Sequence, residues 1–294
     1  MPIQFGAIDA AARPIDDALR AERAHKSNWL IHIGYHRTGS SFLQTELFPL
    51  MSGVAVTSDS CEAKCYINAP DCDLAILTNE SLSSDLKCDT PQRAPELART
   101  FPGARILIGI RSQYSVMRGA YHLHMKSGAP DDYETFVKAR CGRVFDYART
   151  VDAYRQAFGP DSVFVLLHEN LSRDPVGSMA ALLRFAGSDP ALATKVRNRR
   201  IKASAGDPML CVLRSRNRLI APLRELWPFA FEKITYWGVP GASFIDRVLE
   251  GRVRLPAERV RSMICEAYAD GNARLFASLG LDPADYGYPV SEKS

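Results

Sequence analysis

The chain has 294 residues, a formal net charge of +4 and a composition of 46% hydrophobic and 24% charged residues. This composition is typical of a globular protein with a sizeable core, and it excludes a fibrous or largely disordered chain. The charge is mild and no dense run of lysine and arginine occurs, so no nucleic-acid partner is expected.

Neither a membrane span nor a targeting segment is expected from the distribution of apolar residues. No eighteen consecutive residues are apolar, and residues 1–24 lack the apolar core of a signal peptide. Seven cysteines, an odd number, are typical of reduced thiols. Cys61, Cys65, Cys72 and Cys88 lie close together in the sequence, but their spacing lacks the paired C-x-x-C of common zinc sites and favours unligated thiols. We therefore expect a cytoplasmic protein without a bound metal.

Short apolar runs alternate with longer helical patterns along the chain. We expect strands at 30–33, 54–57, 74–78, 105–110 and 162–167. We expect helices at 41–50, 91–100, 112–125, 132–140, 145–158 and 175–186, and further helices at 209–220 and 256–279. The alternation predicts an α/β fold, a P-loop-like doubly wound parallel sheet flanked by helices, with a helical C-terminal part. Residues 1–26 are expected to form an N-terminal extension and 27–290 a single domain, with a helical cap region at about 200–255.

The most informative segment lies between the first predicted strand and the first predicted helix. From Gly34 it reads G-Y-H-R-T-G-S-S-F-L-Q. Gly34 and Gly39 stand at the spacing of a nucleotide P-loop, and glycines there let the backbone approach an anion that a helix start attracts. Ser40 occupies the place of the lysine in kinases and ATPases, and the cation of the loop is Arg37. The segment therefore predicts a phosphate-type anion site that does not hydrolyse ATP.

Two further segments follow predicted strands and are expected near the same site. Asn79 and Glu80 follow the strand at 74–78, and Arg111 follows the strand at 105–110. In doubly wound sheets, ligands bind beyond the carboxyl ends of the strands. The three segments are therefore expected to meet at one crevice.

The sequence from His36 to Gln44 resembles the 5′-phosphosulfate loop of sulfotransferases that use 3′-phosphoadenosine 5′-phosphosulfate (PAPS), in particular the H-K-T-G-T-T-x-L-Q form of bacterial sulfotransferase-domain proteins. Residues 108–121, with Arg111, are similar to the strand, arginine and helix that hold the 3′-phosphate of the donor in that family. The resemblance runs over most of the chain. It implies transfer of a sulfuryl group from PAPS to a hydroxyl of a small molecule or glycan, with a carbohydrate or glycolipid expected.

The resemblance also implies the residues of the donor site, without a metal. The 5′-phosphosulfate loop would comprise Arg37, Thr38, Gly39, Ser40, Ser41 and Phe42. The 3′-phosphate would be bound by residues of two later segments, Arg111, Ser115, Gly119, Arg199, Arg200 and Lys202. Two positions depart from the family pattern. Arg37 replaces the more common lysine and would act electrostatically, while Gly119 replaces a serine whose contact would pass to Ser112, Ser115 or a backbone N–H.

The general base is open among several residues. Glu80 and Asp59 are ranked first, His36 next, and Glu62, His122 and His124 after them. His168 and Glu169 are interpreted as the structural end of a strand. Two alternatives to a sulfotransferase are a small-molecule kinase with a degenerate P-loop, which the missing lysine disfavours, and a non-catalytic nucleotide-binding protein.

Overall fold

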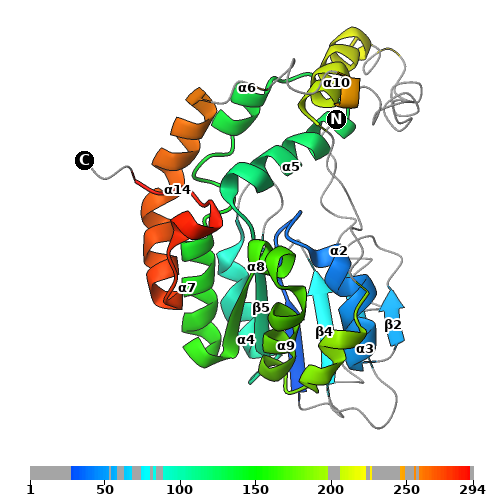
Figure 1. Cartoon of the computed structure of the whole chain (residues 1–294), viewed down its shortest axis with the longest axis vertical. Coiled ribbons are helices and arrows are strands. Elements are labelled where there is room, and N and C mark those ends of the chain that lie inside the picture. Colours follow the sequence, from blue (N-terminus) through cyan, green and yellow to red (C-terminus); the bar gives the residue numbers. More distant parts are fainter. Residues whose placement is uncertain are drawn as a thin grey trace. The chain divides into compact units, whose positions relative to one another are not determined.

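The computed structural model describes residues 28–52, 54–57, 63–67, 74–79, 82–83, 89–197, 206–222, 226, 246–248, 255 and 258–291 (Figure 1). They divide into two units, which are described separately. The first comprises Met1–Asp85, Asp89–Ile110 and Arg149–Arg199, and the second comprises Leu86–Cys88, Arg111–Ala148 and Arg200–Ser294. The extension predicted at 1–26 lies outside the described residues, and a single domain over 27–290 stays a prediction.

The first unit contains a six-stranded sheet in the order β2-β3-β4-β1-β5-β6. Its strands are β1 (Asn28–His32), β2 (Val54–Thr57), β3 (Ala63–Ile67), β4 (Leu74–Asn79), β5 (Arg105–Ile110) and β6 (Val163–Leu167). The four strands β4, β1, β5 and β6 are parallel, with β1 paired to β4 on one side and to β5 on the other. The predicted parallel α/β sheet is confirmed, and β1 lies inside it, where the strand order reverses.

The other two strands differ from the prediction: both are antiparallel to their neighbours, and one of them was not predicted as a strand. The strand predicted at 54–57 is antiparallel to β3, a strand that the sequence analysis missed, and β3 is antiparallel to β4. Only residues 58–62 connect β2 to β3, and only residues 68–73 connect β3 to β4. Parallel neighbours need a crossover of a dozen or more residues, so connections this short impose antiparallel pairing.

The helices of the first unit pack on the sheet through alternating strand residues. Leu30, Ile76 and Leu107 belong to one buried cluster with residues of two helical segments, whose chains run along the sheet in Figure 1. One segment is continuous, from α2 (Ser40–Phe42) through a π-helical turn (Leu43–Leu47) to α3 (Phe48–Ser52), and the other is α9 (Pro175–Phe185). Neighbouring strand residues point to the opposite face, where Trp29 contacts Phe101 with ring centroids 4.9 Å apart.

The remaining helices of this unit follow the predicted pattern, with one addition. They are α4 (Ala94–Thr100), α7 (Tyr147–Phe158, which begins in the second unit), α8 (His168–Arg173), and 3₁₀ turns at Pro91–Arg93, Pro160–Ser162 and Pro190–Lys195. Helix α9 begins where expected because the Asp174 side chain accepts a hydrogen bond from the Gly177 N–H, 2.9 Å away, and Pro175 takes the first helical position. Helix α8 is the addition: β6 ends at Leu167 and the chain turns directly into a helix.

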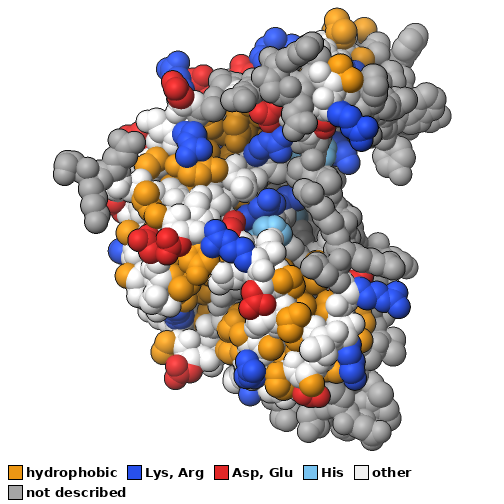
Figure 2. Space-filling model, viewed as in Figure 1, with side chains coloured by type: hydrophobic (Ala, Val, Ile, Leu, Met, Phe, Trp, Pro, Cys, Tyr) orange, Lys and Arg blue, Asp and Glu red, His pale blue; other side chains and the backbone are white. Residues whose placement is uncertain are grey.

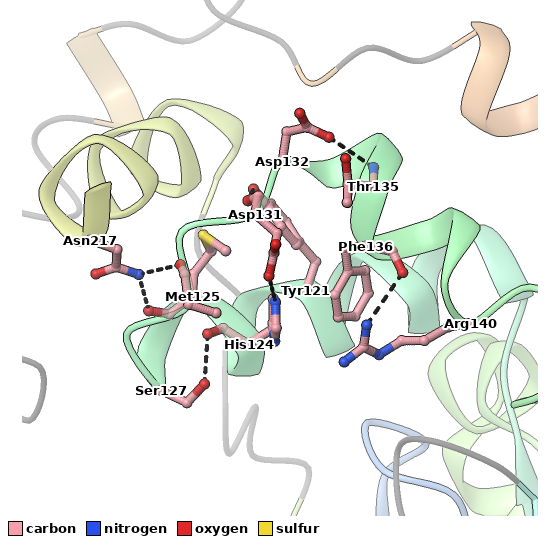
Figure 3. Close-up of polar contacts among 11 residues, drawn as sticks. Tyr121, His124, Met125, Ser127, Asp131, Asp132, Thr135, Phe136, Arg140 and Asn217 are labelled. Carbon is pink, nitrogen blue, oxygen red and sulfur yellow. Dashed lines mark hydrogen bonds and ion pairs between the residues drawn. The ribbon is translucent and has the colours of Figure 1, made fainter. Parts of the chain in front are cut away.

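The second unit is helical in its described part. It contains α5 (Gln113–Lys126), α6 (Tyr133–Lys138), α10 (Asp207–Ile220), α14 (Glu258–Leu279) and a 3₁₀ turn (Pro283–Tyr286). Buried amides join these elements: Gln113 and Asn272 exchange two hydrogen bonds of 2.9 and 3.1 Å. Asn217 of α10 donates to the carbonyl of Met125, in the last turn of α5, and to that of Ala129, just after α5, at 2.7 and 2.8 Å (Figure 3). The predicted helical C-terminal part is confirmed over these residues.

The described residues were searched for a charged surface patch, a membrane-spanning helix and a metal-binding cluster. In the view of Figure 2, basic and acidic side chains are interspersed and form no continuous field of one sign. Among the described helices, none is both long enough and apolar enough to cross a membrane. The described side chains also include no group of three or more metal-binding residues; of the cysteines clustered in the sequence, only the backbone of Cys65 is described.

Candidate functional site

The loop from Ile33 to Gly39 lies at the carboxyl end of β1, within the first unit. Its first residues extend the pairing with β5, because the Ile33 N–H donates to Leu107 and the Tyr35 N–H to Gly109, at 2.9 and 3.3 Å. Arg37 and Gly39 then adopt left-handed conformations, with φ of 67° and 101°. These two residues turn the chain abruptly from the strand into the helix that starts at Ser40.

The helix start behind this loop has no capping side chain. Gly39 is its N-cap and offers only backbone, while the N–H groups of Phe42 and Leu43 donate back to the Gly39 carbonyl at 2.9 and 3.1 Å. An α-helix leaves its earlier N–H groups without acceptors inside the helix, which here applies to Ser40 and Ser41. With the positive end of the helix dipole, this arrangement favours an anion.

The structure explains why two loop positions are glycine. A Cβ on Gly34 would collide with Nε2 of His32 and lie 3.1 Å from Oγ of Ser40. At Gly39 the backbone itself is left-handed, and a Cβ would lie 3.3 Å from both Nδ1 of His168 and Cδ2 of Leu171. Close packing against the protein's own side chains therefore requires glycine at both positions.

Two of the predicted hydroxyl ligands are turned into the loop. The Thr38 hydroxyl donates to the Tyr35 carbonyl at 2.6 Å, and the Ser40 hydroxyl approaches the same oxygen at 3.4 Å. Both side chains are nearly inaccessible, with exposures of 1% and 2%. In this structure these hydroxyls stabilise the turn. The side chains of Arg37, Ser41 and Phe42, in the same loop and at the helix start, are half-buried.

His168 is a neighbour of the loop that the sequence analysis missed. His168 is the first residue of α8, directly after β6, which agrees with its interpretation as the end of a strand. Its imidazole approaches Gly39. The two residues are far apart in the sequence, and nothing in the local pattern around His168 indicates the contact. Only the pairing of β6 next to β5 brings them together.

The predicted base candidates fall into three groups. Asp59, Glu62 and Glu80 lie outside the described residues, although β4, which precedes Glu80, pairs Thr78 with His32 next to the loop. His36 lies in the loop and is half-buried. His122 and His124 are on α5 in the second unit, where His122 is 7% exposed.

His124 is paired with an acidic residue. Its Nε2 lies 2.7 Å from Oδ2 of Asp131, and its ring lies against Phe136, with centroids 4.9 Å apart (Figure 3). Burial lowers the pKa of His124, and the hydrogen bond that its ring donates to the Asp131 carboxylate opposes that effect. Because the folded pKa is depressed, the unfolded chain takes up the proton first, so stability falls as pH decreases below about 6.5.

Replacing Asp131 by asparagine is expected to lower the pKa of His124 further, because the opposing carboxylate is lost while Arg140 and burial remain. Stability would then decline over a wider range below pH ~6.5. An NMR titration of the His124 ring measures the shift directly. A pKa of His124 equal to or above the wild-type value would contradict this account of the pair.

The predicted 3′-phosphate residues with described positions lie in the second unit. Arg111 is the first residue after β5 and is half-buried, and its carbonyl accepts a hydrogen bond from the Tyr147 hydroxyl at 2.7 Å. The Ser112 hydroxyl donates to the Gly287 carbonyl at 2.6 Å, so it is engaged within the unit. Ser115 is half-buried in the first turn of α5, and Gly119 is buried. Arg199, Arg200 and Lys202 lie outside the described residues.

The chain was compared with protein families, with curated proteins and with solved structures. A model described as the sulfotransferase family matches residues 10–190. The solved structures similar to this chain include a sulfotransferase from Alicyclobacillus acidocaldarius, with 15% identity, a TM-score of 0.45 and coverage of 88% of this chain and 98% of that one. They also include mouse sulfotransferase SULT7A1 complexed with PAP, with 13% identity, a TM-score of 0.42 and coverage of 81% and 88%. No curated protein matches the chain.

Proposed function

Because this chain belongs to the sulfotransferase family, we propose that it transfers a sulfuryl group from PAPS to a hydroxyl acceptor. The observation that supports the donor assignment most is the loop after β1. It combines an uncapped helix start with a permanently charged guanidinium on Arg37, whose backbone is held in a left-handed conformation. These groups fit a 5′-phosphosulfate, which needs several donors and a cation at close range.

The position of Ser40 disfavours the kinase alternative. A nucleotide P-loop has a lysine there that reaches the β- and γ-phosphates of ATP. In this chain the position holds a short side chain, 2% exposed, whose hydroxyl faces the Tyr35 carbonyl. A group so placed cannot supply the missing charge. The cation of this loop is Arg37, three residues earlier. We therefore propose that the loop binds a phosphosulfate donor, whose reaction needs no lysine at the position of Ser40.

The proposed reaction is an in-line displacement at sulfur. The acceptor oxygen forms a bond to sulfur while the bond from sulfur to the bridging phosphate oxygen breaks, and the acceptor proton passes to a base. Negative charge then develops on the departing 5′-phosphate, where Arg37 and the helix-start N–H groups would stabilise it. Catalysis would depend on positioning and charge stabilisation, as in phosphoryl transfer.

The rest of the donor would be bound by residues that follow β5. Arg111 is proposed to bind the 3′-phosphate, and Ser115 to replace the family serine at Gly119, because the Ser112 hydroxyl is engaged by Gly287. Arg199, Arg200 and Lys202 remain candidates for the same phosphate. A carbohydrate or glycolipid is the proposed acceptor, on the strength of the family resemblance.

The proposal is tested by transfer of ³⁵S from labelled PAPS to a panel of glycan and glycolipid acceptors, with phenols for comparison. A labelled product that depends on the acceptor would support a sulfotransferase. Donor binding without any product across the panel would favour the non-catalytic alternative.

The base is tested by two isosteric changes. We expect Glu80→Gln and Asp59→Asn both to keep donor affinity, while one of them lowers turnover by about 10²–10⁴-fold, the usual contribution of a general base. Steady-state kinetics at saturating donor would measure the loss, and Glu62→Gln would test the lower-ranked candidate Glu62 in the same way. Full activity in both variants would transfer the assignment to His36.

A further inference from the structure

His32 is a fully buried titratable residue at the end of β1, with an exposure of 0%. Its Nδ1 lies 2.8 Å from the Thr78 hydroxyl on β4, and its ring meets the ring of Phe48 edge-on, with centroids 5.5 Å apart. The side-chain amide of Gln44, in the π-helical turn behind the loop, donates to the same Thr78 hydroxyl at 2.9 Å. The three polar side chains thus link two strands to the helical segment that follows the anion loop.

The hydrogen bonds around Thr78 favour one tautomer of His32. A threonine hydroxyl has one hydrogen to donate. Gln44 donates its own hydrogen to the Thr78 oxygen, and donation of the hydroxyl hydrogen to Nδ1 of His32 gives that hydrogen an acceptor among the side-chain partners of Thr78 within the described residues. Nδ1 is then an acceptor, and a neutral imidazole with that arrangement has its hydrogen on Nε2.

The Nε2 edge of the His32 ring faces the anion loop at Gly34. It fills the space where a Cβ on Gly34 would be, and the same position is 3.1 Å from the Ser40 hydroxyl oxygen. In this tautomer, the group that faces Gly34 is an N–H. The opposite tautomer would place a lone pair at that point, beneath backbone that has to present its own N–H groups to an anion.

We propose that His32, Thr78 and Gln44 form a positioning relay, which holds Nε2–H of His32 against Gly34 and so keeps the loop in its anion-binding conformation. The inference rests on the proposed function, because the anion concerned is the 5′-phosphosulfate of the donor. His32 is a positioning residue, since it is buried and acts through Gly34 and Ser40.

The test compares variants of Thr78 with matched side chains. Thr78→Val removes the hydroxyl and keeps the shape, whereas Thr78→Ser keeps the hydroxyl. We expect Thr78→Val to weaken binding of 3′-phosphoadenosine 5′-phosphate (PAP) by about tenfold, the effect of one or two lost hydrogen bonds, and Thr78→Ser to bind as the wild type does. In turnover, Thr78→Val should raise KM for PAPS and leave kcat at saturating donor little changed.

A second variant inverts the relay. In Gln44→Glu the carboxylate accepts the Thr78 hydrogen, so His32 must donate from Nδ1 and turn a lone pair toward Gly34. We expect the ¹⁵N NMR signals of His32 to show the exchanged tautomer and PAP binding to fall. Thr45→Glu, on the exposed neighbouring residue, controls for added charge and should keep both the wild-type tautomer and most of the affinity. Because Gln44 is only half-buried, this variant also decides the question if Thr78→Val does not fold.

The outcomes separate the relay from the donor assignment. A wild-type His32 with its hydrogen on Nδ1 overturns the relay, whatever the protein binds. Equal PAP affinity in Thr78→Val, Gln44→Glu and the wild type overturns its positioning role. A wild type with the expected tautomer that binds no PAP overturns the donor assignment, and with it the function given to the relay.

Discussion

Arg37→Ala is expected to lower turnover by about 10²–10³-fold and to weaken PAP binding, because the variant loses the cation placed to stabilise charge on the leaving phosphate. The guanidinium is permanently charged and can hold two oxygens at once, which neither backbone N–H groups nor a hydroxyl can reproduce. Steady-state kinetics with PAPS and calorimetry with PAP measure the two effects separately.

The controls for Arg37 separate its charge from its backbone. The residue has a φ of 67°, so Arg37→Ala keeps the backbone strain of the wild type, whereas Arg37→Gly relieves that strain and still removes the charge. We expect Arg37→Gly to lose as much turnover as Arg37→Ala, and Arg37→Lys to keep more activity than either. Wild-type kinetics in Arg37→Gly would contradict the electrostatic role.

Gly34→Ala is the second substitution with a large expected effect. The added Cβ collides with Nε2 of His32 and closely approaches the Ser40 hydroxyl, and both neighbours are buried. Overpacking of this kind costs about 1–3 kcal/mol of unfolding free energy. The displaced groups, the His32 ring and the Ser40 hydroxyl, pack directly against the loop. We therefore expect PAP binding to fall below detection in calorimetry, while chemical denaturation still shows a folded protein.

A glycine in α14 provides the matched control for this change. At Gly271 a Cβ would make an ordinary contact of 3.6 Å with Ala148. Gly271→Ala is therefore expected to leave PAP binding unchanged and to stabilise the helix by about 0.5–1 kcal/mol. Equal losses of PAP binding in Gly34→Ala and Gly271→Ala would contradict the specific role of Gly34.

Local patterns in the sequence were sufficient for the parallel core of the fold. The runs at 105–110 and 74–78 coincide with β5 and with most of β4 because buried parallel strands are apolar on both faces. The same patterns do not report strand direction, so β2 was predicted at 54–57 without its antiparallel direction, and β3 was not predicted. The short connections around β3 contain that information, since five or six residues do not allow a parallel crossover.

The candidate site was predicted in part for a similar reason. The glycines, Arg37 and the helix start are adjacent in the sequence, and their spacing indicates an anion loop directly. His32 and Thr78 are 46 positions apart, and His168 is farther still from Gly39, so only the folded sheet brings each pair together. The commitment of the Thr38 and Ser112 hydroxyls to carbonyls likewise depends on backbone geometry that residue type does not specify.

Calorimetric titration of the 294-residue chain with PAP, compared with ATP and AMP in the presence and absence of magnesium, tests the donor assignment most directly. The account predicts metal-independent binding of PAP, with ATP and AMP much weaker, because Arg37 and the helix-start N–H groups supply the charge that a metal would otherwise provide. Preferential binding of ATP with magnesium would contradict it and identify the loop as a kinase-like phosphate site.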